Sequence, residues 1–335
     1  MGSDRGAFLL QQRHRRRAND LSSLQHPARC CTMKRLSDIG EDALIARLIS
    51  KAPCDTAPGA GPGDDCAVVE HSIVADRLEL LKTDALVCNV HFTPDSPPRQ
   101  VGWKAVARLV SDFAAMGGRP ERFLVTLALP PETELAWAES LYEGIGEALR
   151  CFNAQLAGGE TSRVPAGSAA VISIAATGSV ARDSLVLRST GRPGDVLMVT
   201  GRLGGSIAHK HLHFMPRIEE SDWLVSNFKP TAMMDISDGL AKDLPRFAES
   251  SACGFELNFE VLPRQEGCGV DQALGDGEDY ELLFAIAPGQ VAKLQAAWAK
   301  RFPDLELTAI GRLVEEGKGI TLSGGWDHFA GQPNA

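Results

Sequence analysis

The sequence predicts an α/β protein of the α+β type with two domains, and three observations support this fold class. The chain has 335 residues, more than one hydrophobic core usually organises. Its composition, 44% hydrophobic and 23% charged, is that of a soluble globular protein. Helical and strand-like apolar patterns alternate in both halves, on either side of a Gly- and Pro-containing segment at 182–195. We therefore expect domains at 33–184 and 185–335.

The first domain is expected to start with a short helix and to contain one long buried helix. Apolar residues at helical spacing predict a helix at 42–49, which the Pro- and Gly-rich stretch 52–63 ends. The long helix opens at Pro98 and closes before Gly117, and its apolar positions recur at i, i+4 intervals. The other predicted elements of this half are strands at 72–75, 78–83, 122–129, 155–157 and 169–179 and a helix at 132–152.

The second domain is expected to mix helices and strands in the same way. Predicted strands lie at 196–200, 255–261 and 280–287, with one running into Met234-Asp235 and others near Leu307 and Ile320. Predicted helices lie at 205–214, from Gly239 onward and at 291–301. Both halves are therefore α/β, and no short-period repeat is present.

The first 32 residues differ in composition from the rest of the chain. They hold six Arg against Asp4 and Asp20, a net charge of +4, whereas the remaining chain carries −13. This stretch lacks the apolar run of a secretory signal, although an Arg-rich, acid-poor start is also typical of a transit peptide. We expect residues 1–32 to be a disordered basic extension, and Met33 is an alternative start of the chain.

Charge, hydropathy and cysteine spacing exclude several classes of function. A net-acidic body argues against broad nucleic-acid binding. No run of 18 or more apolar residues is present, so no membrane span is expected. The eight cysteines form no C-x-x-C pair with zinc-site spacing and are interpreted as reduced thiols. A cytoplasmic protein is therefore predicted, and a redox or zinc protein is a distant alternative.

Four short acidic clusters lie next to glycines or at the ends of expected elements. Magnesium favours such hard oxygen ligands, because it keeps several waters and binds through a few carboxylates plus substrate phosphates. The clusters are Gly63-Asp64-Asp65, Thr83-Asp84, Ser111-Asp112 and Asp235-Ile236-Ser237-Asp238. They predict a magnesium-dependent phosphoryl-transfer enzyme.

Each cluster also has a purely structural interpretation. Gly-Asp-Asp is a common turn, and Asp84 can end a strand. Ser237 and Asp238 can cap the helix that starts at Gly239. Asp112 is harder to explain in this way, because it lies in an apolar helix, where a lone buried carboxylate is costly unless it is paired or metal-bound. Convergence of the clusters on one pocket would favour the metal interpretation.

Nucleotide contacts are predicted from a glycine pair and one arginine. Gly158-Gly159 lets a nucleotide approach the backbone, and the following Glu160 could reach a metal. Arg188 could neutralise a transferring phosphoryl group, although an isolated Arg is more often a solvated surface charge. The chain lacks both the Walker spacing and the G-x-G-x-x-G spacing. NAD binding is therefore rejected, and a nucleotide must be held by another architecture.

In this order, the motifs resemble those of the thiamine-monophosphate kinase family, which shares a superfamily with aminoimidazole ribonucleotide synthetase and selenophosphate synthetase. The resemblance covers about 36–329. It rests on Gly-Asp-Asp-Cys-Ala from Gly63, Thr-Asp-Ala-Leu-Val-Cys-Asn-Val-His-Phe from Thr83, Val-Gly-Trp-Lys-Ala-Val from Val101, Ser-Asp-Phe-Ala-Ala-Met-Gly from Ser111, Met-Asp-Ile-Ser-Asp-Gly-Leu from Met234, Gly-Glu-Asp-Tyr-Glu-Leu from Gly277 and Trp-Asp-His-Phe from Trp326.

The resemblance implies the two-domain fold of aminoimidazole ribonucleotide synthetase, with a dimerising sheet in the first domain and an α/β second domain. It also implies a homodimer, several Mg²⁺ ions, ATP as co-substrate and thiamine monophosphate as acceptor. The implied metal ligands are Asp65, Thr83, Asp84, Asp112, Glu160, Asp235 and Asp238. The implied ATP contacts are Gly159, Glu160, Arg188 and Ser237. The implied thiamine phosphate contacts are His91, Glu278 and Trp326, since an aromatic ring and a carboxylate suit a cationic thiazolium and an aminopyrimidine.

The implied reaction is direct in-line transfer of the γ-phosphoryl group, which needs no catalytic base because the acceptor oxygen is already anionic. Arg188 is the side chain that could assist. Three residues depart from the family's pattern: Glu160 stands where Asp is common, and Lys82 and Asp276 replace small residues. The alternatives are another ATP-dependent enzyme of the same superfamily and a non-catalytic nucleotide-binding homologue.

Overall fold

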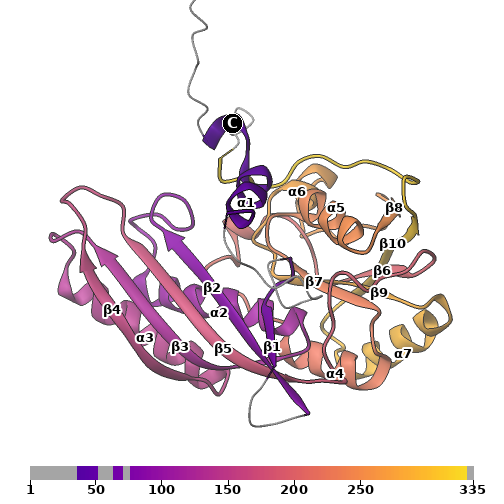
Figure 1. Ribbon diagram of the computed structural model, residues 1–335, viewed down its shortest axis with the longest axis horizontal. Helices are drawn as coiled ribbons and strands as arrows, with labels where there is room; N and C mark the ends of the chain where they lie inside the picture. Colours follow the sequence, from indigo (N-terminus) through magenta and orange to yellow (C-terminus); the bar gives the residue numbers. More distant parts are fainter. Residues whose placement is uncertain (1–35, 52–62, 71–75, 330–335) are drawn as a thin grey trace, which may run out of the picture.

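The computed structural model describes residues 36–51, 63–70 and 76–329. Within these ranges the chain forms two five-stranded sheets, one from each half of the sequence, which lie beside each other with helices packed on them (Figure 1). The predicted two-domain α/β fold is confirmed. The expected extension 1–32 and the expected strand 72–75 lie outside the described residues.

The first sheet has the strand order β1-β2-β5-β3-β4. Its strands are β1 (Ala67–Glu70), β2 (Arg77–Val87), β3 (Arg119–Leu129), β4 (Gln155–Arg163) and β5 (Val171–Ala181). Only β3 and β4 pair in parallel, because α3 (Leu135–Cys151) carries the chain back between them. All other neighbours in this sheet are antiparallel.

Helices α2 (Pro98–Ala115) and α3 cover one face of this sheet (Figure 1). Two glycines let the helices touch: a Cβ on Gly102 would lie 2.0 Å from the carbonyl oxygen of Leu141, and one on Gly144 would lie 1.8 Å from that of Arg99. This close approach buries α2 over most of its length. No helix of the described residues covers the opposite face, which we call the outer face.

The second sheet has the order β7-β9-β6-β10-β8, and all its neighbours are antiparallel. Its strands are β6 (Val196–Thr200), β7 (Ala232–Ile236), β8 (Cys253–Leu257), β9 (Glu281–Ile286) and β10 (Leu307–Glu315). Helices α5 (Leu240–Ser250) and α6 (Val270–Gly275) pack on one face, and α4 (Ile218–Phe228) and α7 (Val291–Arg301) pack on the other. β7 and β9 are therefore buried along their whole length.

The two halves share part of their hydrophobic core. Phe214, Ile218 and Tyr280 from the second half pack into the core of the first sheet, and Ala115 at the end of α2 packs into the core around α4 and α7. α2 also contacts β7 directly. The C-terminal half of α2 therefore lies at the junction of the two sheets, where the acidic motifs meet.

Several predicted elements differ in the structure. The helix predicted at 205–214 is wrong: only the short 3-10 helix Ser206–Ala208 forms there, after Gly204 and Gly205 with positive φ of 84° and 70°. α4 and α6 were not predicted. No strand forms near Ile320, where an isolated bridge joins Phe255 to Gly319.

Other predicted strands differ from the structure mainly at their boundaries. β4 continues through the glycine pair at 158–159 to Arg163, because it pairs with β3 on both sides of a register shift at Ala157. The strand expected at 255–261 is β8, which ends at Leu257. Among the described residues, none of the helices is both long and apolar enough to cross a bilayer.

Candidate active site

Three predicted metal ligands converge on one buried point. Ligand oxygens of Asp65, Asp112 and Asp235 all lie within 4.8 Å of one another. Asp65 precedes β1, Asp112 is on α2 and Asp235 is on β7, so residues far apart in the sequence meet at the junction of the two sheets. All three side chains are buried, at 5%, 7% and 3% exposure. We call these residues the acidic triad.

The electrostatics of the acidic triad fit a bound cation. Burial and the charge of Asp65 raise the pKa of Asp235 to about 7. Burial raises the pKa of Asp112 well above the usual range, although Lys82 opposes this shift. Oδ2 of Asp65 is buried and has no hydrogen-bond partner among the described residues. Three crowded carboxylates with an unpaired buried oxygen are the ligand chemistry that Mg²⁺ prefers, so these residues fit the implied metal.

Each side of the acidic triad also carries a basic or hydroxyl partner from the same chain. Arg188 Nη2 donates to Asp65 Oδ1 at 2.7 Å. Lys82 Nζ donates to Asp112 Oδ1 at 2.7 Å, and Ser111 Oγ donates to Asp235 Oδ2 at 2.6 Å. The predicted Arg188 is thus placed against this cluster, where its guanidinium neutralises part of the acidic charge.

Asp84 and Thr83 point to opposite faces of β2. Lys82 and Asp84 share the inward face with the buried Leu80, whereas Thr83 points to the outer face, as the period of two requires. Asp84 Oδ2 lies 3.0 Å from Arg108 Nη2 on α2. Thr83 Oγ1 donates to the carbonyl oxygen of Ile174. The structure therefore places Asp84 beside the triad and turns the Thr83 side chain away from it.

A cavity of about 520 Å³ lies next to this cluster and contains all three predicted thiamine phosphate contacts. His91, Glu278 and Trp326 line it, together with Ser237 and Asp238. The two sites are adjacent, because the Asp84 partner Arg108 also lines this cavity. Residues from both halves of the chain line this cavity, so it lies at the junction of the two halves.

His91 is held neutral in the wall of this cavity. Its Nδ1 accepts a hydrogen bond from the backbone N–H of Val87 at 3.0 Å, which leaves Nε2 to carry the proton. Burial, with a smaller effect of Arg108, lowers the pKa of His91 to about 4. The ring lies 5.3 Å from that of His328. A neutral imidazole can donate from Nε2 without adding charge to the pocket.

Glu278 is fixed by an unusual backbone conformation and two side-chain partners. Its φ is 60°, and its N–H donates to the carbonyl oxygen of Ser237 at 2.7 Å. Lys104 Nζ lies 2.6 Å from Glu278 Oε2, and Tyr280 Oη donates to the same oxygen at 3.2 Å. The carboxylate is therefore presented to the cavity in a set orientation, with its charge balanced by a buried lysine.

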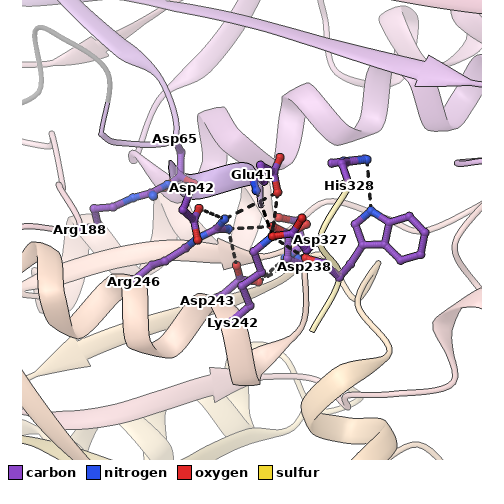
Figure 2. Close-up of polar contacts among 12 residues, drawn as sticks. Glu41, Asp42, Asp65, Arg188, Asp238, Lys242, Asp243, Arg246, Asp327 and His328 are labelled. Atoms are coloured by element: carbon purple, nitrogen blue, oxygen red, sulfur yellow. Dashed lines mark hydrogen bonds and ion pairs between the residues drawn. The ribbon is translucent and has the colours of Figure 1, made fainter. Parts of the chain in front are cut away.

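Asp238 lies in a second ionic cluster, which is drawn in Figure 2. Arg246 Nη1 lies 2.7 Å and Lys242 Nζ lies 3.3 Å from Asp238 Oδ2. The same two bases contact Glu41 and Asp42 at the start of α1 (Glu41–Ile49). Although Asp238 lines the cavity, its carboxylate is engaged by two bases, and it is not a member of the acidic triad.

Asp276, one of the departures from the family's pattern, has a structural partner. Its Oδ2 accepts from the N–H of Gly205 at 2.9 Å, and the residue lines the cavity. Gly159 and Glu160 lie elsewhere. They are on β4, which β5 and β3 separate from β2, and Glu160 pairs with the exposed Thr126 on the outer face. Within one chain, Glu160 therefore does not join the acidic triad.

Sequence reasoning missed two basic residues of the site. Lys104 and Arg108 were not singled out, although they lie four residues apart on α2 and lead to Asp112 at the same interval. This i, i+4, i+8 spacing puts all three on one helix face. The argument that identified Asp112, a charge inside an apolar helix, applies equally to both and could have found them.

Comparison with known protein families agrees with the geometry. The family model for AIR synthase related protein, N-terminal domain, matches residues 63–180, and the model for the C-terminal domain matches 192–322. Among solved structures, AaThiL complexed with AMPPCP and TMP has a TM-score of 0.74 and 31% sequence identity, and the match covers 89% of this chain and 100% of that chain. A thiamine monophosphate kinase structure from Aquifex aeolicus has a TM-score of 0.68 and 29% identity, with 88% and 99% covered.

Curated relatives match over similar lengths. The thiamine-monophosphate kinase of Rhodopirellula baltica is 35% identical over 291 residues, which cover 82% of this chain and 89% of the relative. That of Aquifex aeolicus is 34% identical over 329 residues, which cover 88% and 100%. That of Escherichia coli K12 is 30% identical, with 87% and 98% covered. On this identity and coverage, the chain belongs to the thiamine-monophosphate kinase family of the AIR synthase related proteins.

Proposed function

We propose that this protein transfers the γ-phosphoryl group of ATP to thiamine monophosphate and so produces thiamine diphosphate and ADP. The observation that carries this proposal is the contact between two sites: the acidic triad adjoins a cavity lined by His91, Glu278 and Trp326, through the Arg108–Asp84 pair. The relatives named for this activity, and the related structure with AMPPCP, an ATP analogue, and TMP, support it.

The reaction is a single displacement at phosphorus. An anionic oxygen of the acceptor phosphate attacks the γ-phosphorus, and the bond from this phosphorus to the β,γ-bridging oxygen breaks, so that ADP leaves with the electron pair. No covalent enzyme intermediate forms. Because the attacking oxygen is already ionised near neutral pH, the protein contributes positioning and charge neutralisation, and no side chain acts as a base.

Asp65, Asp112 and Asp235 would hold Mg²⁺, with Asp84 beside them, and the metal would neutralise the negative charge of the triphosphate. Arg188 and Ser237 would contact the nucleotide from the two sides of the cluster. The Asp238 carboxylate is paired with Arg246 and Lys242, so it would bind a metal only if the metal replaced these two bases. We therefore assign Asp238 a secondary role among the metal ligands.

The cavity suits the thiamine end of the acceptor. The Trp326 ring offers an aromatic surface for a cationic thiazolium, and Glu278 offers a carboxylate to an aminopyrimidine. His91 stays neutral and donates a hydrogen bond. Exclusion of water by the two halves then strengthens these contacts.

We further infer a homodimer that buries the outer face of the first sheet. Val69, Leu81 and Leu124 are apolar and exposed on this face, at 40%, 39% and 50%. An exposed apolar sheet face is a liability that a second copy removes. Thr83 and Glu160 lie on the same face, so they would meet the second copy instead of the triad of their own chain. The boundary near residue 185 and a cytoplasmic location stay predictions.

ADP release tests the proposed activity and its alternatives. Purified protein with ATP, Mg²⁺ and thiamine monophosphate should release ADP and form thiamine diphosphate in equal amounts. Release only with a ribonucleotide or another acceptor would favour a different enzyme of the superfamily. ATP binding without release with any acceptor would favour a non-catalytic homologue.

A further inference from the structure

Lys82 lies inside the acidic cluster that is expected to bind metal. Its side chain is on the inward face of β2, and Nζ lies 2.7 Å from Asp112 Oδ1. The side chains of Lys82 and Asp112 are 23% and 10% exposed. Because Asp112 is one of the three acids whose oxygens lie within 4.8 Å of one another, the ammonium group sits at the edge of the proposed metal position.

The ammonium group also has more than one acidic neighbour. Nζ contacts Asp112, and Asp84 lies two residues along β2 on the same inward face, so the ammonium group lies among carboxylates from two different elements. The other two acids of the triad, Asp65 and Asp235, have no lysine as a partner among the described residues. Arg188 pairs with Asp65, and Asp235 accepts from the hydroxyl of Ser111.

A fixed ammonium and a divalent ion compete for the same carboxylate. Mg²⁺ binds oxygen at about 2.0–2.1 Å with strict octahedral geometry, and two cations on one carboxylate repel each other strongly at low dielectric. Asp65 Oδ2 is buried and has no hydrogen-bond partner in the part of the chain that the structure describes, so it marks the open side of the cluster. The Asp112 side is already occupied by Lys82.

We propose that Lys82 serves as a resident cation of this cluster and takes the place of one divalent ion. The chain then binds one divalent ion fewer in the absence of nucleotide than it would with a neutral residue at this position. This inference rests on the proposed function only in the assumption that the cluster binds a divalent ion. The contact between Lys82 and Asp112 is present without any substrate.

Counting bound Mn²⁺ by electron paramagnetic resonance, without ATP or thiamine monophosphate, tests the proposal. Lys82→Met and Lys82→Gln should each bind one more Mn²⁺ per chain than the unchanged protein. Lys82→Arg keeps the charge and should bind the same number. Lys293→Met on α7, far from the cluster, is a matched control and should also bind the same number.

An unchanged count in both neutral variants would overturn the proposal. A gain in Lys82→Arg would do so too, since the effect would then follow side-chain shape instead of charge. If the neutral variants do not fold in the absence of metal, adding Mn²⁺ should restore a thermal unfolding transition. The absence of such a transition with Mn²⁺ would count against the proposal. A failure of the proposed kinase activity is distinguishable, because it appears in ADP release and leaves the Mn²⁺ count unaffected.

Discussion

Lys104 Nζ lies 2.6 Å from Glu278 Oε2, and this ion pair joins α2 of the first half to the loop before β9 in the second half. The lysine side chain is 0% exposed. The same ammonium donates to the carbonyl oxygen of His91 at 2.8 Å and lies 3.0 Å from His211 Nδ1. One buried cation therefore organises two of the three side chains that we assign to the thiamine phosphate.

Lys104→Met should weaken thiamine monophosphate binding and spare ATP binding. Without the ammonium, the Glu278 carboxylate keeps the Tyr280 hydroxyl as its one side-chain partner among the described residues, and the carbonyl oxygen of His91 loses the hydrogen bond from Lys104. We expect KM for thiamine monophosphate to rise about 10- to 100-fold, which is about 1.4–2.8 kcal/mol, with KM for ATP within a factor of two. Steady-state ADP release at varied concentrations of each substrate measures both.

Arg99→Met supplies the control, because Arg99 is on the same helix and forms an exposed pair with Glu147. It should leave both KM values unchanged. A fall in kcat for Lys104→Met with no change in KM would show that the lysine acts on the chemical step and not on the acceptor pocket.

Asp235→Asn should abolish turnover without loss of stability. Asp235 is buried beside Asp65, and burial disfavours its charge, so the amide relieves like-charge repulsion when no metal is bound. Urea unfolding without divalent metal should therefore give a free energy of unfolding equal to or above that of the unchanged protein. Turnover near the normal rate in this variant would contradict the role of the triad in catalysis.

The sequence predicted the parts of the fold that local patterns specify strongly. α2 was placed within a residue or so of its ends, because proline opens it, a glycine pair closes it and its apolar positions repeat regularly. The segment 205–214 shows where such reasoning fails. Its composition allows a helix, but Asp279 accepts from Gly204 N–H and Ser206 Oγ and holds the segment in a tight turn. That contact depends on a residue more than seventy positions away.

The sequence predicted which residues form the site better than it predicted how they are arranged. Motif order supplied Asp65, Asp112 and Asp235, which the structure brings together. Strand alternation could have separated Thr83 from Asp84, since neighbouring residues on a strand face opposite sides. The place of Glu160 could not be deduced, because it depends on the order of strands in the sheet.

Leu124→Glu should convert the proposed dimer into monomers. Leu124 is on β3, 50% exposed on the outer face, and a carboxylate there would be desolvated against its symmetry mate. Size-exclusion chromatography with light scattering gives the mass directly. Leu135→Glu, at the exposed start of α3 on the other side of the sheet, should keep the mass of a dimer. A monomeric unchanged protein would refute the interface.

Asp279 should make stability fall as pH rises. Burial raises its pKa from 3.8 to about 6, although the hydrogen bonds from Ser206 and Gly204 oppose this shift. The folded protein therefore binds a proton at Asp279 more tightly than the unfolded chain does. This contribution to the free energy of unfolding is on the order of 3 kcal/mol below about pH 4, and it is lost as the pH rises past 6. Asp279→Asn should flatten this part of the urea stability profile between pH 4 and 7. Asp271→Asn, exposed on α6, should leave the slope as it is.

Trp326 is held through its main chain by the ionic cluster of Figure 2. Its N–H donates to the carbonyl oxygen of Asp238 at 2.8 Å, and its own carbonyl oxygen accepts from Lys242 Nζ. Lys242 also pairs with Glu41 at 2.8 Å, so one side chain ties α1 to the aromatic wall of the cavity.

Lys242→Met should therefore loosen α1 and the Trp326 segment together. The Lys242 side chain is 9% exposed, so its loss leaves Glu41 and Asp238 short of a partner in a poorly solvated place. We expect faster hydrogen exchange in α1 and at the Trp326 amide, and about a tenfold rise in KM for thiamine monophosphate, because the ring is no longer positioned over the thiazolium. Lys242→Arg, which keeps the charge, should recover most of both effects. If KM rose while exchange in α1 stayed slow, Lys242 would act on the pocket alone and the coupling to α1 would be refuted.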